Sequence, residues 1–356
     1  MRTSITVADL VSGEASDFVA SAKWVVDAER LGVHTVWSAE AWGSDGVVPL
    51  AYLAALTSTI RLATGVLQIT ARAVSMTAMT AMTLDHVSNG RLILGLGVSG
   101  PQVVEGLHGQ SFARPLERLR ETVDVLRLAF SGAQLEYDGN QIKLPLPGGA
   151  GRALRVGMEP RRQVPIHLAT LGPQALRFAG AAASGWVGTC FVPERAGFYI
   201  EHLQQGAASA GRSLAGFEID AGGPIAFTDD VDRPLRARKK ALAFQLGAMG
   251  SPTTNFYNDA YSRIGYAEPA RSVRELWVSG KHREAIDAVP DELALRTSFI
   301  GTDEMVRDRI RAHRDAGVTD LRLQPMGATP TDKLDALAHM IDLVRDVDLE
   351  TPIERP

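Results

Sequence analysis

The sequence of 356 residues predicts an α/β fold of the TIM-barrel type, in which eight parallel strands alternate with helices. A helix, a glycine stop and a short apolar strand recur along the chain, as at Gly32 before residues 33–38 and at Gly317 before residues 318–323. This repeat is typical of parallel βα units. Two stretches between the strands exceed ordinary connections, so we expect insertions after strands 4 and 7. A doubly wound open sheet is the alternative.

The elements follow from local signals in the order of the chain. Apolar runs bounded by turn residues predict strands near residues 4–8, 33–38, 61–66, 91–96, 164–168, 185–189, 217–226 and 318–323. Caps, proline starts and apolar spacing of three and four residues predict helices at residues 16–31, 48–58, 75–88 and 115–130, and one that opens at Gly172-Pro173. Ser16 is the expected cap of the first helix. In the helix at 75–88, the residues expected to face the core are Met76, Ala78, Met79, Ala81 and Met82.

Two insertions are expected within one domain that spans residues 1–356. Residues 132–163 hold a predicted hairpin around Asp138-Gly139, followed by a loop rich in glycine and proline. Residues 228–302 hold several helical patterns with aromatic side chains. Insertions at the carboxyl ends of barrel strands commonly build lids and pockets, and extra packing or a dimer surface is the alternative.

Composition limits the class of function. Lys and Arg number 37 and Asp and Glu number 41, which gives a net charge of −4, and the isoelectric point is near 6.1. Because no bulk positive field exists, we do not expect a nucleic-acid partner. The chain has one cysteine and no apolar stretch long enough to span a membrane. We expect a cytoplasmic protein without a membrane partner that acts on a small molecule, with a homodimer as a possible assembly.

Short motifs in the sequence argue for or against a nucleotide, phosphate or metal site. Residues 95–100 match the spacing G-x-G-x-x-G after a strand, but Pro101 follows at once and the next helix is expected near residue 115. The acidic residue that completes a dinucleotide site is also missing, so we reject that interpretation. Gly172 before Pro173 can open a helix whose free N–H groups favour a phosphate. The scattered histidines predict no metal site.

Four segments together resemble a known family. They are VWSAEAW at 36–42, TGVLQIT at 64–70, GLGVSGPQVVEGLHG at 95–109 and LATLGPQALRFAG at 168–180. The chain resembles the bacterial luciferase-like family, and within it the actinobacterial branch that depends on coenzyme F420. The resemblance covers residues from about 20 to 345 and implies a TIM barrel with insertions.

The resemblance also implies a cofactor site. F420 is a deazaflavin with a flat ring, a phosphate and an anionic glutamate tail. The resemblance implies a bulge after strand three at Gly65-Val66, often with a non-prolyl cis peptide, which supports the ring. The residues that match cofactor-binding positions are Glu40, Gly65, Val66, Leu67, Gln68, Ser99, Gly100, Leu171, Gly172, Pro173, Gly188 and Thr189. A basic loop at residues 152–162 is a candidate to meet the acidic tail, and a merely solvated loop is the alternative.

The resemblance implies an enzyme whose substrate is unidentified. Glu40-Ala41 replaces the Asp-His pair of the family's sugar-phosphate dehydrogenases, so no acid or base is assigned. Trp42 and His108 are candidates for the substrate side. The expected activity is hydride transfer to or from C5 of F420. The alternatives are a monooxygenase that uses FMN and a cofactor-binding protein without turnover.

Overall fold

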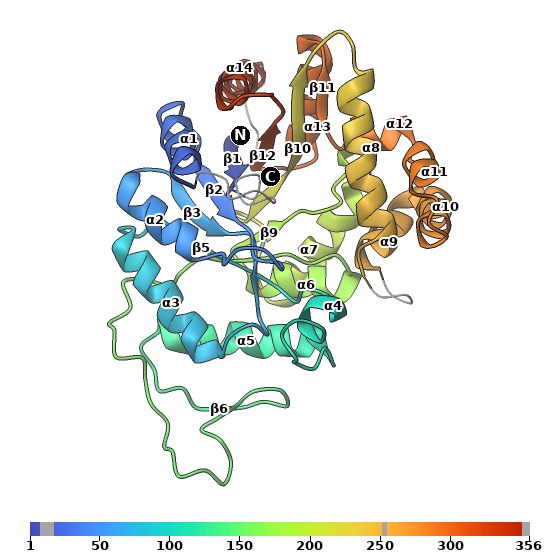
Figure 1. Cartoon of the computed structure of the whole chain (residues 1–356). Coiled ribbons are helices and arrows are strands. Elements are labelled where there is room, and N and C mark those ends of the chain that lie inside the picture. Colours follow the sequence, from blue (N-terminus) through green and yellow to red (C-terminus); the bar gives the residue numbers. More distant parts are fainter. Residues whose placement is uncertain (8–17, 251–254, 351–356) are drawn as a thin grey trace.

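The computed structural model describes residues 1–7, 18–250 and 255–350, which form a closed barrel of parallel strands (Figure 1). The barrel strands are β1 (Arg2–Thr6), β2 (Thr35–Ser38), β3 (Arg61–Thr64), β5 (Leu92–Gly97), β8 (Ile166–Leu168), β9 (Gly185–Val187), β10 (Glu218–Phe227) and β12 (Asp320–Pro325). Strand β10 pairs with β12 on one side and with β9, at the other end of the strand order, on the other, so the sheet closes on itself. The closed barrel confirms the predicted TIM-type fold and excludes the open sheet.

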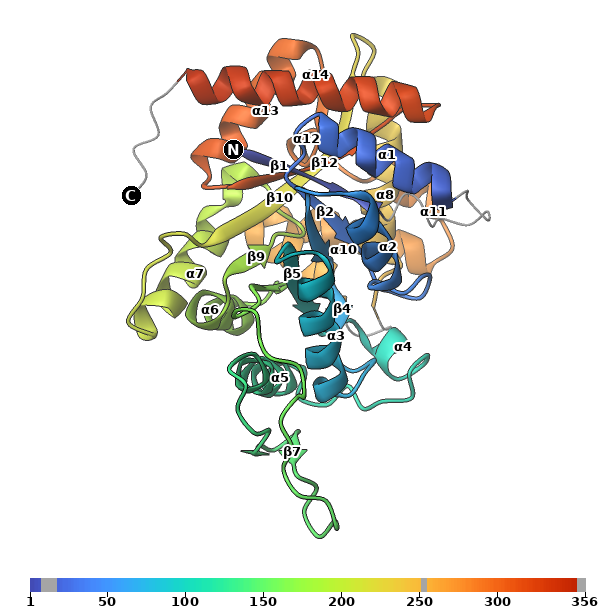
Figure 2. The ribbon, with the colours of Figure 1, turned by 90° about the vertical axis from the view of Figure 1, so that its left-hand side faces the viewer.

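Helices cover the outside of the barrel (Figures 1 and 2). They are α1 (Phe18–Arg30), α2 (Val48–Leu56), α3 (Val74–Val87), α5 (Pro115–Phe130), α6 (Pro173–Ala182), α7 (Gly197–Ser209), α13 (Asp303–Asp315) and α14 (Pro330–Leu349). The predicted glycine stops are confirmed, because Gly32 and Gly317 adopt φ values of 92° and 87° after α1 and α13. The predicted cap Ser16 lies outside the described residues.

Several expectations about local structure are wrong. Met76 and Met79 are 51% and 46% exposed on α3, whereas Met82 is buried as predicted, because the helix turns its Ala78 and Ala81 face inward. A one-turn helix, α4 (Pro101–Val104), begins directly after Gly100, where a loop was expected. Two short strands were not predicted, β4 (Leu67–Gln68) beside β5 and β11 (Phe299–Gly301) beside β10.

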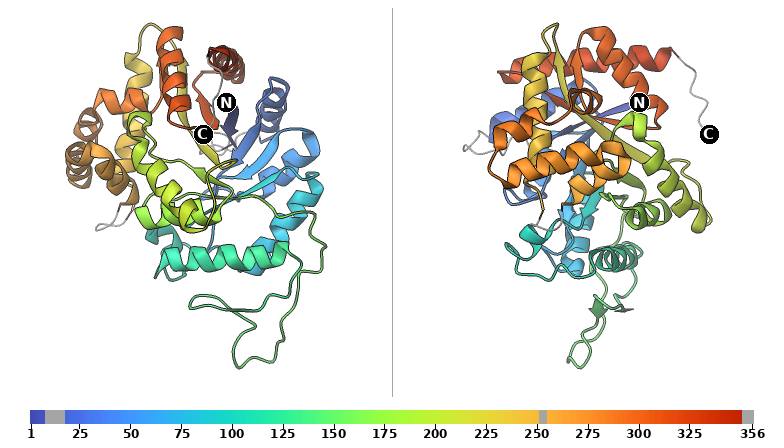
Figure 3. Two further views of the ribbon diagram at one scale, coloured as in Figure 1. Left: turned by 180° about the vertical axis from the view of Figure 1, so that it is seen from behind. Right: turned by 90° about the vertical axis from the view of Figure 1, so that its right-hand side faces the viewer.

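The two insertions lie at different ends of the barrel. The second follows β10 directly and packs as a group of helices on one side of the barrel (Figure 3). Its helices are α8 (Asp232–Gly247), α9 (Phe256–Tyr261), η3 (Ser262–Tyr266), α10 (Ala267–Val278), α11 (His282–Asp287) and α12 (Asp291–Arg296). The short turn η2 (Pro193–Arg195) lies outside this insertion, just before α7. Because the insertion starts where a strand ends, it lies at the carboxyl end of the barrel.

The first insertion lies at the amino end of the strands instead. It forms the predicted hairpin, β6 (Tyr137–Asp138) and β7 (Lys143–Leu144), and it projects beyond α5 (Figure 2). Arg162 donates to Asp85 at 2.8 Å and Arg161 to Asn89 at 2.6 Å, just before β5 begins. The base of this basic loop is therefore fixed at the amino end of the barrel, away from the other predicted site residues, which favours the alternative of a solvated loop.

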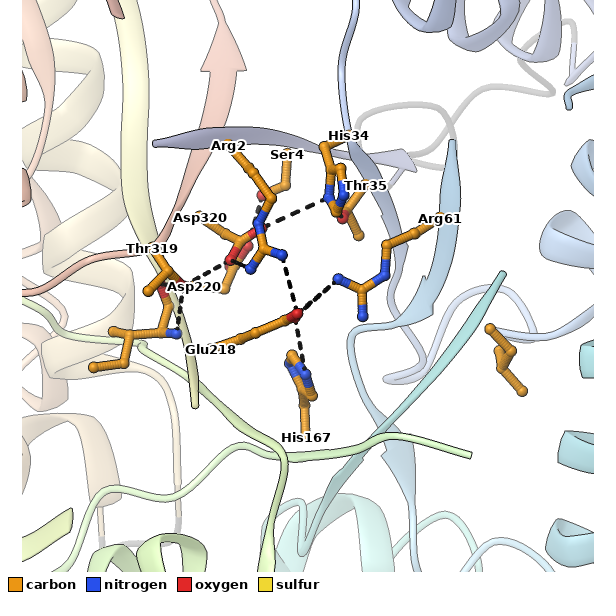
Figure 4. Close-up of polar contacts among 12 residues, drawn as sticks. Arg2, Ser4, His34, Thr35, Arg61, His167, Glu218, Asp220, Thr319 and Asp320 are labelled. Atoms are coloured by element: carbon orange, nitrogen blue, oxygen red, sulfur yellow. Dashed lines mark hydrogen bonds and ion pairs between the residues drawn. The ribbon is translucent and has the colours of Figure 1, made fainter. Parts of the chain in front are cut away.

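Charged side chains fill the amino end of the barrel interior (Figure 4). Arg2, Arg61, Glu218 and Asp320 are each the first residue of their strand. Arg61 donates to Glu218 at 2.9 Å, Arg2 lies 3.1 Å from Glu218, and Arg2 donates to Asp320 at 2.5 Å. These ion pairs therefore link strands that are distant in sequence across the amino end of the barrel.

Histidine completes this cluster. His167 Nε2 lies 3.3 Å from a carboxylate oxygen of Glu218. Burial by itself would raise the pKa of Glu218, but hydrogen bonding and charge from His167 and Arg61 hold it below its ordinary value. Glu218 therefore stays ionised wherever the unfolded chain would keep it ionised. The charge of Glu218 stabilises the fold fully above the pKa that Glu has in the unfolded chain, about 4.3. That stabilisation is lost as the pH falls through the lower pKa of Glu218 in the folded protein.

No helix in the ranges described above is both long and apolar enough to cross a membrane.

Replacing Glu218 by Gln is expected to lower the free energy of unfolding by about 2–3 kcal/mol at neutral pH, because two arginines lose a partly buried partner. The deficit is expected to shrink in acid, where the parent loses the same charge. Urea unfolding at neutral and acidic pH measures both effects. Glu304→Gln, at an exposed pair with Arg311, is the control and should change little. A Glu218 variant as stable as the parent would contradict the structural role.

Candidate functional site

The predicted site residues lie together at the carboxyl end of the barrel. Each follows the end of a strand, from β2, β3, β5, β8 and β9, and these ends meet in a closed parallel barrel. We call this end the mouth, and its loops are residues 39–47, 65–72, 98–113, 169–173 and 188–192. The sequence therefore predicted correctly which loops gather, although the role of each residue stays a prediction.

A bulge follows strand β3. Ala63 pairs with Ile93, and Leu67 pairs with Leu96, so four steps along one strand oppose three along the other. The peptide bond Gly65–Val66 within this bulge is cis, as predicted. The Thr64 hydroxyl donates to the carbonyl oxygen of Gly95 and accepts from its N–H, each at 2.8 Å. One side chain thus replaces the backbone pairing that the extra residue interrupts.

The glycines of the G-x-G stretch make room for this bulge. A Cβ on Gly95 would lie 1.9 Å from the carbonyl oxygen of Thr64, and a Cβ on Gly97 would lie 2.6 Å from Cγ2 of Val66. Both positions therefore need glycine because of close approach inside the fold. This packing agrees with the rejection of a dinucleotide motif and gives the first two glycines a physical reason.

Trp37 lies beneath the bulge, inside the barrel. A Cβ on Gly65 would lie 3.0 Å from Cε3 of Trp37, whose side chain is 2% exposed. The indole N–H donates to Asp220 at 3.0 Å. Asp220 also accepts from the Ser4 hydroxyl at 2.6 Å and lies 3.2 Å from Arg322 Nε. Trp37 is therefore fixed from below and supports the backbone that faces the mouth.

Glu40 is tied to an arginine that the sequence analysis missed. Arg72 donates to both carboxylate oxygens of Glu40, at 2.8 and 2.6 Å, and to Asp45 at 2.7 Å. Hydrogen bonding to Glu40, against a smaller effect of burial, raises the pKa of Arg72. A single arginine in a loop carries no spacing signal, so only the folded loops reveal this pair.

The start of α6 is open, as a phosphate site requires. Gly172 is the N-cap with φ −91° and ψ 155°, no side chain caps the helix, and a Cβ there would meet nothing within 4 Å. The first-turn N–H groups have no intrahelical partners and favour an anion. Gly100 is equally open at the start of α4. These two glycines leave space at the mouth that the packed Gly95 and Gly97 do not.

Both backbone polar groups of Gly188, at the end of β9, are hydrogen-bonded within the barrel. Its N–H donates to the carbonyl oxygen of Asp220 at 2.7 Å, and its own carbonyl accepts from Arg322 at 3.0 Å. A Cβ there would lie 3.0 Å from the Trp186 ring. Its backbone is thus engaged within the barrel, while the next residue, Thr189, is half-buried.

The second insertion reaches the mouth. The Gln102 amide donates to the carbonyl oxygen of Gly250, and the rings of Phe112 and Phe256 lie 6.0 Å apart. Trp42 is 60% exposed, and Nε2 of half-buried His108 has no hydrogen-bond partner within the part of the chain that the structure describes. Among the described residues no cluster of His, Cys, Asp or Glu could hold a metal. The mouth therefore offers apolar surface and backbone donors.

Comparison with known proteins gives the family. The family model for luciferase-like monooxygenases matches residues 4–320. A Mycobacterium tuberculosis protein whose name provisionally describes it as a coenzyme F420-dependent oxidoreductase is 42% identical over 306 residues, covering 84% of this chain and 88% of its own. A 5,10-methylenetetrahydromethanopterin reductase of Archaeoglobus fulgidus is 28% identical over 295 residues, covering 83% of this chain and 86% of its own.

Solved structures share the fold. The coenzyme F420 dependent tetrahydromethanopterin reductase from Methanopyrus kandleri matches with a TM-score of 0.76 at 24% identity, over 95% of this chain and 97% of that one. An F420-dependent secondary alcohol dehydrogenase matches with a TM-score of 0.73 at 17% identity, over 97% and 100% of the two chains. The family match over residues 4–320, together with the relative at 42% identity, shows that the chain belongs to the luciferase-like monooxygenase family.

Proposed function

We propose that this protein is a coenzyme F420-dependent oxidoreductase that transfers a hydride between C5 of the deazaflavin and a small organic substrate. The observation that carries the proposal is the bulge at Thr64–Val66 at the same mouth as the uncapped start of α6. One feature suits a flat ring and the other a phosphate. The relative at 42% identity, whose name includes F420, supports the choice of cofactor.

Two features of the mouth support this proposal, a fixed backbone after β3 and an open helix start at α6. Residues 65–68 would support one face of the ring, because Trp37 and Thr64 hold that backbone in place. Gly172 and the first turn of α6 would bind the phosphate, and Ser99-Gly100, where Gly100 leaves open space, would contribute to the same site. When bound, the deazaflavin supplies the hydride chemistry at C5.

The chain's own contribution is to orient and to exclude water. Trp42 and the insertion residue Phe256 add apolar surface around the mouth, which would shield the reacting carbon from solvent. The carboxylate of Glu40, which also accepts from the Gln68 N–H just after the bulge, is paired with Arg72 and is therefore not a free base there.

Titration of the apoprotein tests the choice of cofactor. F420 is expected to bind at least about tenfold more tightly than FMN, which corresponds to about 1.4 kcal/mol. The helix start serves either phosphate, so the difference must arise from the ring and the tail. Preference for FMN, with oxygen uptake by the reduced flavin complex, would favour a monooxygenase instead. Hydride exchange at bound F420 would eliminate a protein that only carries the cofactor.

Gly172→Asp tests the phosphate site. The carboxylate is expected to weaken F420 binding at least about tenfold by placing like charge beside the phosphate. The thermal midpoint of the apoprotein should hold or rise, since Asp is a good N-cap and the backbone there suits any residue. Gly197→Asp, which also has open space, adds the same charge to the first turn of α7 and should leave affinity unchanged. Equal affinity of the Gly172 variant would place the phosphate elsewhere.

A further inference from the structure

Four donors already approach the carboxylate of Glu40, and the two from Arg72 are the closest. Its Oε1 accepts from Arg72 Nη1 at 2.8 Å and from the Gln68 N–H at 3.3 Å. Its Oε2 accepts from Arg72 Nη2 at 2.6 Å and from the Gly46 N–H at 3.5 Å. A carboxylate offers about four lone-pair sites, and four donors already approach them. The side chain is also 9% exposed.

Arg72 closes the turn that begins at Glu40. The same guanidinium donates to Glu40 and to Asp45, the two ends of the turn. Asp45 in turn accepts from the N–H groups of Val47 and Val48 at 2.8 and 2.7 Å, at the start of α2. The Gln68 amide donates to the carbonyl oxygen of Ala41 at 2.7 Å. The Arg72 guanidinium, together with the Gln68 amide, therefore fixes the turn at residues 40–45 against the loop that follows the bulge.

Trp42 lies within this turn. It is the large apolar side chain between the two tethered carboxylates, and it is 60% exposed at the mouth. An exposed aromatic held on a tied turn can present a fixed flat surface to a ligand at little entropic cost. Without the Arg72 guanidinium, the carboxylates of Glu40 and Asp45 would repel each other, and the turn would lose its fixed position.

We infer that Glu40 and Arg72 act as one positioning unit, which holds Trp42 at the mouth, and that Glu40 does not itself touch the cofactor or substrate. The inference deepens the proposed function and rests on it for the identity of the ligand. It departs from the direct ring contact that the resemblance implies for Glu40. Arg72 is a positioning residue in the same sense, because it acts through the turn.

A double-mutant cycle on F420 affinity separates the two roles. Glu40→Gln and Arg72→Met are each expected to weaken F420 binding about three- to tenfold, and the double variant no more than either one. Arg72→Lys, which keeps the charge but loses the fork, should recover part of the affinity. Arg236→Met removes an exposed pair with Asp287 and is the control expected to bind as the parent does. Additive losses from Glu40→Gln and Arg72→Met would overturn the inference, because Glu40 would then contact the ligand independently.

A second readout does not depend on the ligand. Acrylamide quenching of Trp42, taken as the difference from Trp42→Phe, is expected to rise in both Glu40→Gln and Arg72→Met, and no further in the double variant than in Arg72→Met, because only Arg72→Met also loses the bond to Asp45. Urea unfolding confirms that each variant is folded. If the parent fails to bind F420 while quenching shows this pattern, the proposed cofactor is wrong and the positioning unit stands. Unchanged quenching in both folded single variants would overturn the unit itself.

Discussion

The position of the backbone at the mouth depends on the interactions of one buried side chain, Asp220. It joins three other strands of the barrel, through the Ser4 hydroxyl, the Trp37 indole N–H and the Arg322 guanidinium. Moving any of these groups away would leave a buried carboxylate without a partner, which is unfavourable in free energy. The interactions therefore hold Ser4, Trp37 and Arg322 in position. Trp37 then lies directly under Gly65. The polar interior thus sets the position of the backbone that faces a ligand.

Two kinds of anchoring meet at the mouth. From below, Trp37 and the Thr64 hydroxyl fix the bulge within the barrel wall. From the side, Arg72 fixes the turn after β2 against the loop after the bulge. The start of α6 carries no side-chain cap and no packed neighbour at Gly172. A rigid backbone beside an open, uncapped helix start is what the proposed flat, phosphorylated cofactor would require.

The sequence predicted what is local and missed what is distant. The glycine stops at Gly32 and Gly317 mark βα units, so the barrel and its strand ends followed from short segments. The pairing of Arg61 with Glu218 joins residues 157 apart, and that of Arg72 with Glu40 joins residues 32 apart. Neither pair leaves a pattern in the chain. The first insertion was expected at the mouth because its length suggested a lid, but it follows a helix and so lies at the other end.

A crystal structure of the protein with F420 tests the central claim most directly. The account predicts that the ring lies against residues 65–68 and that the phosphate accepts from the first-turn N–H groups of α6 at Gly172. It also predicts that Glu40 keeps both bonds to Arg72 in the complex. A ring bound away from the bulge, or a phosphate held at another helix, would contradict the account.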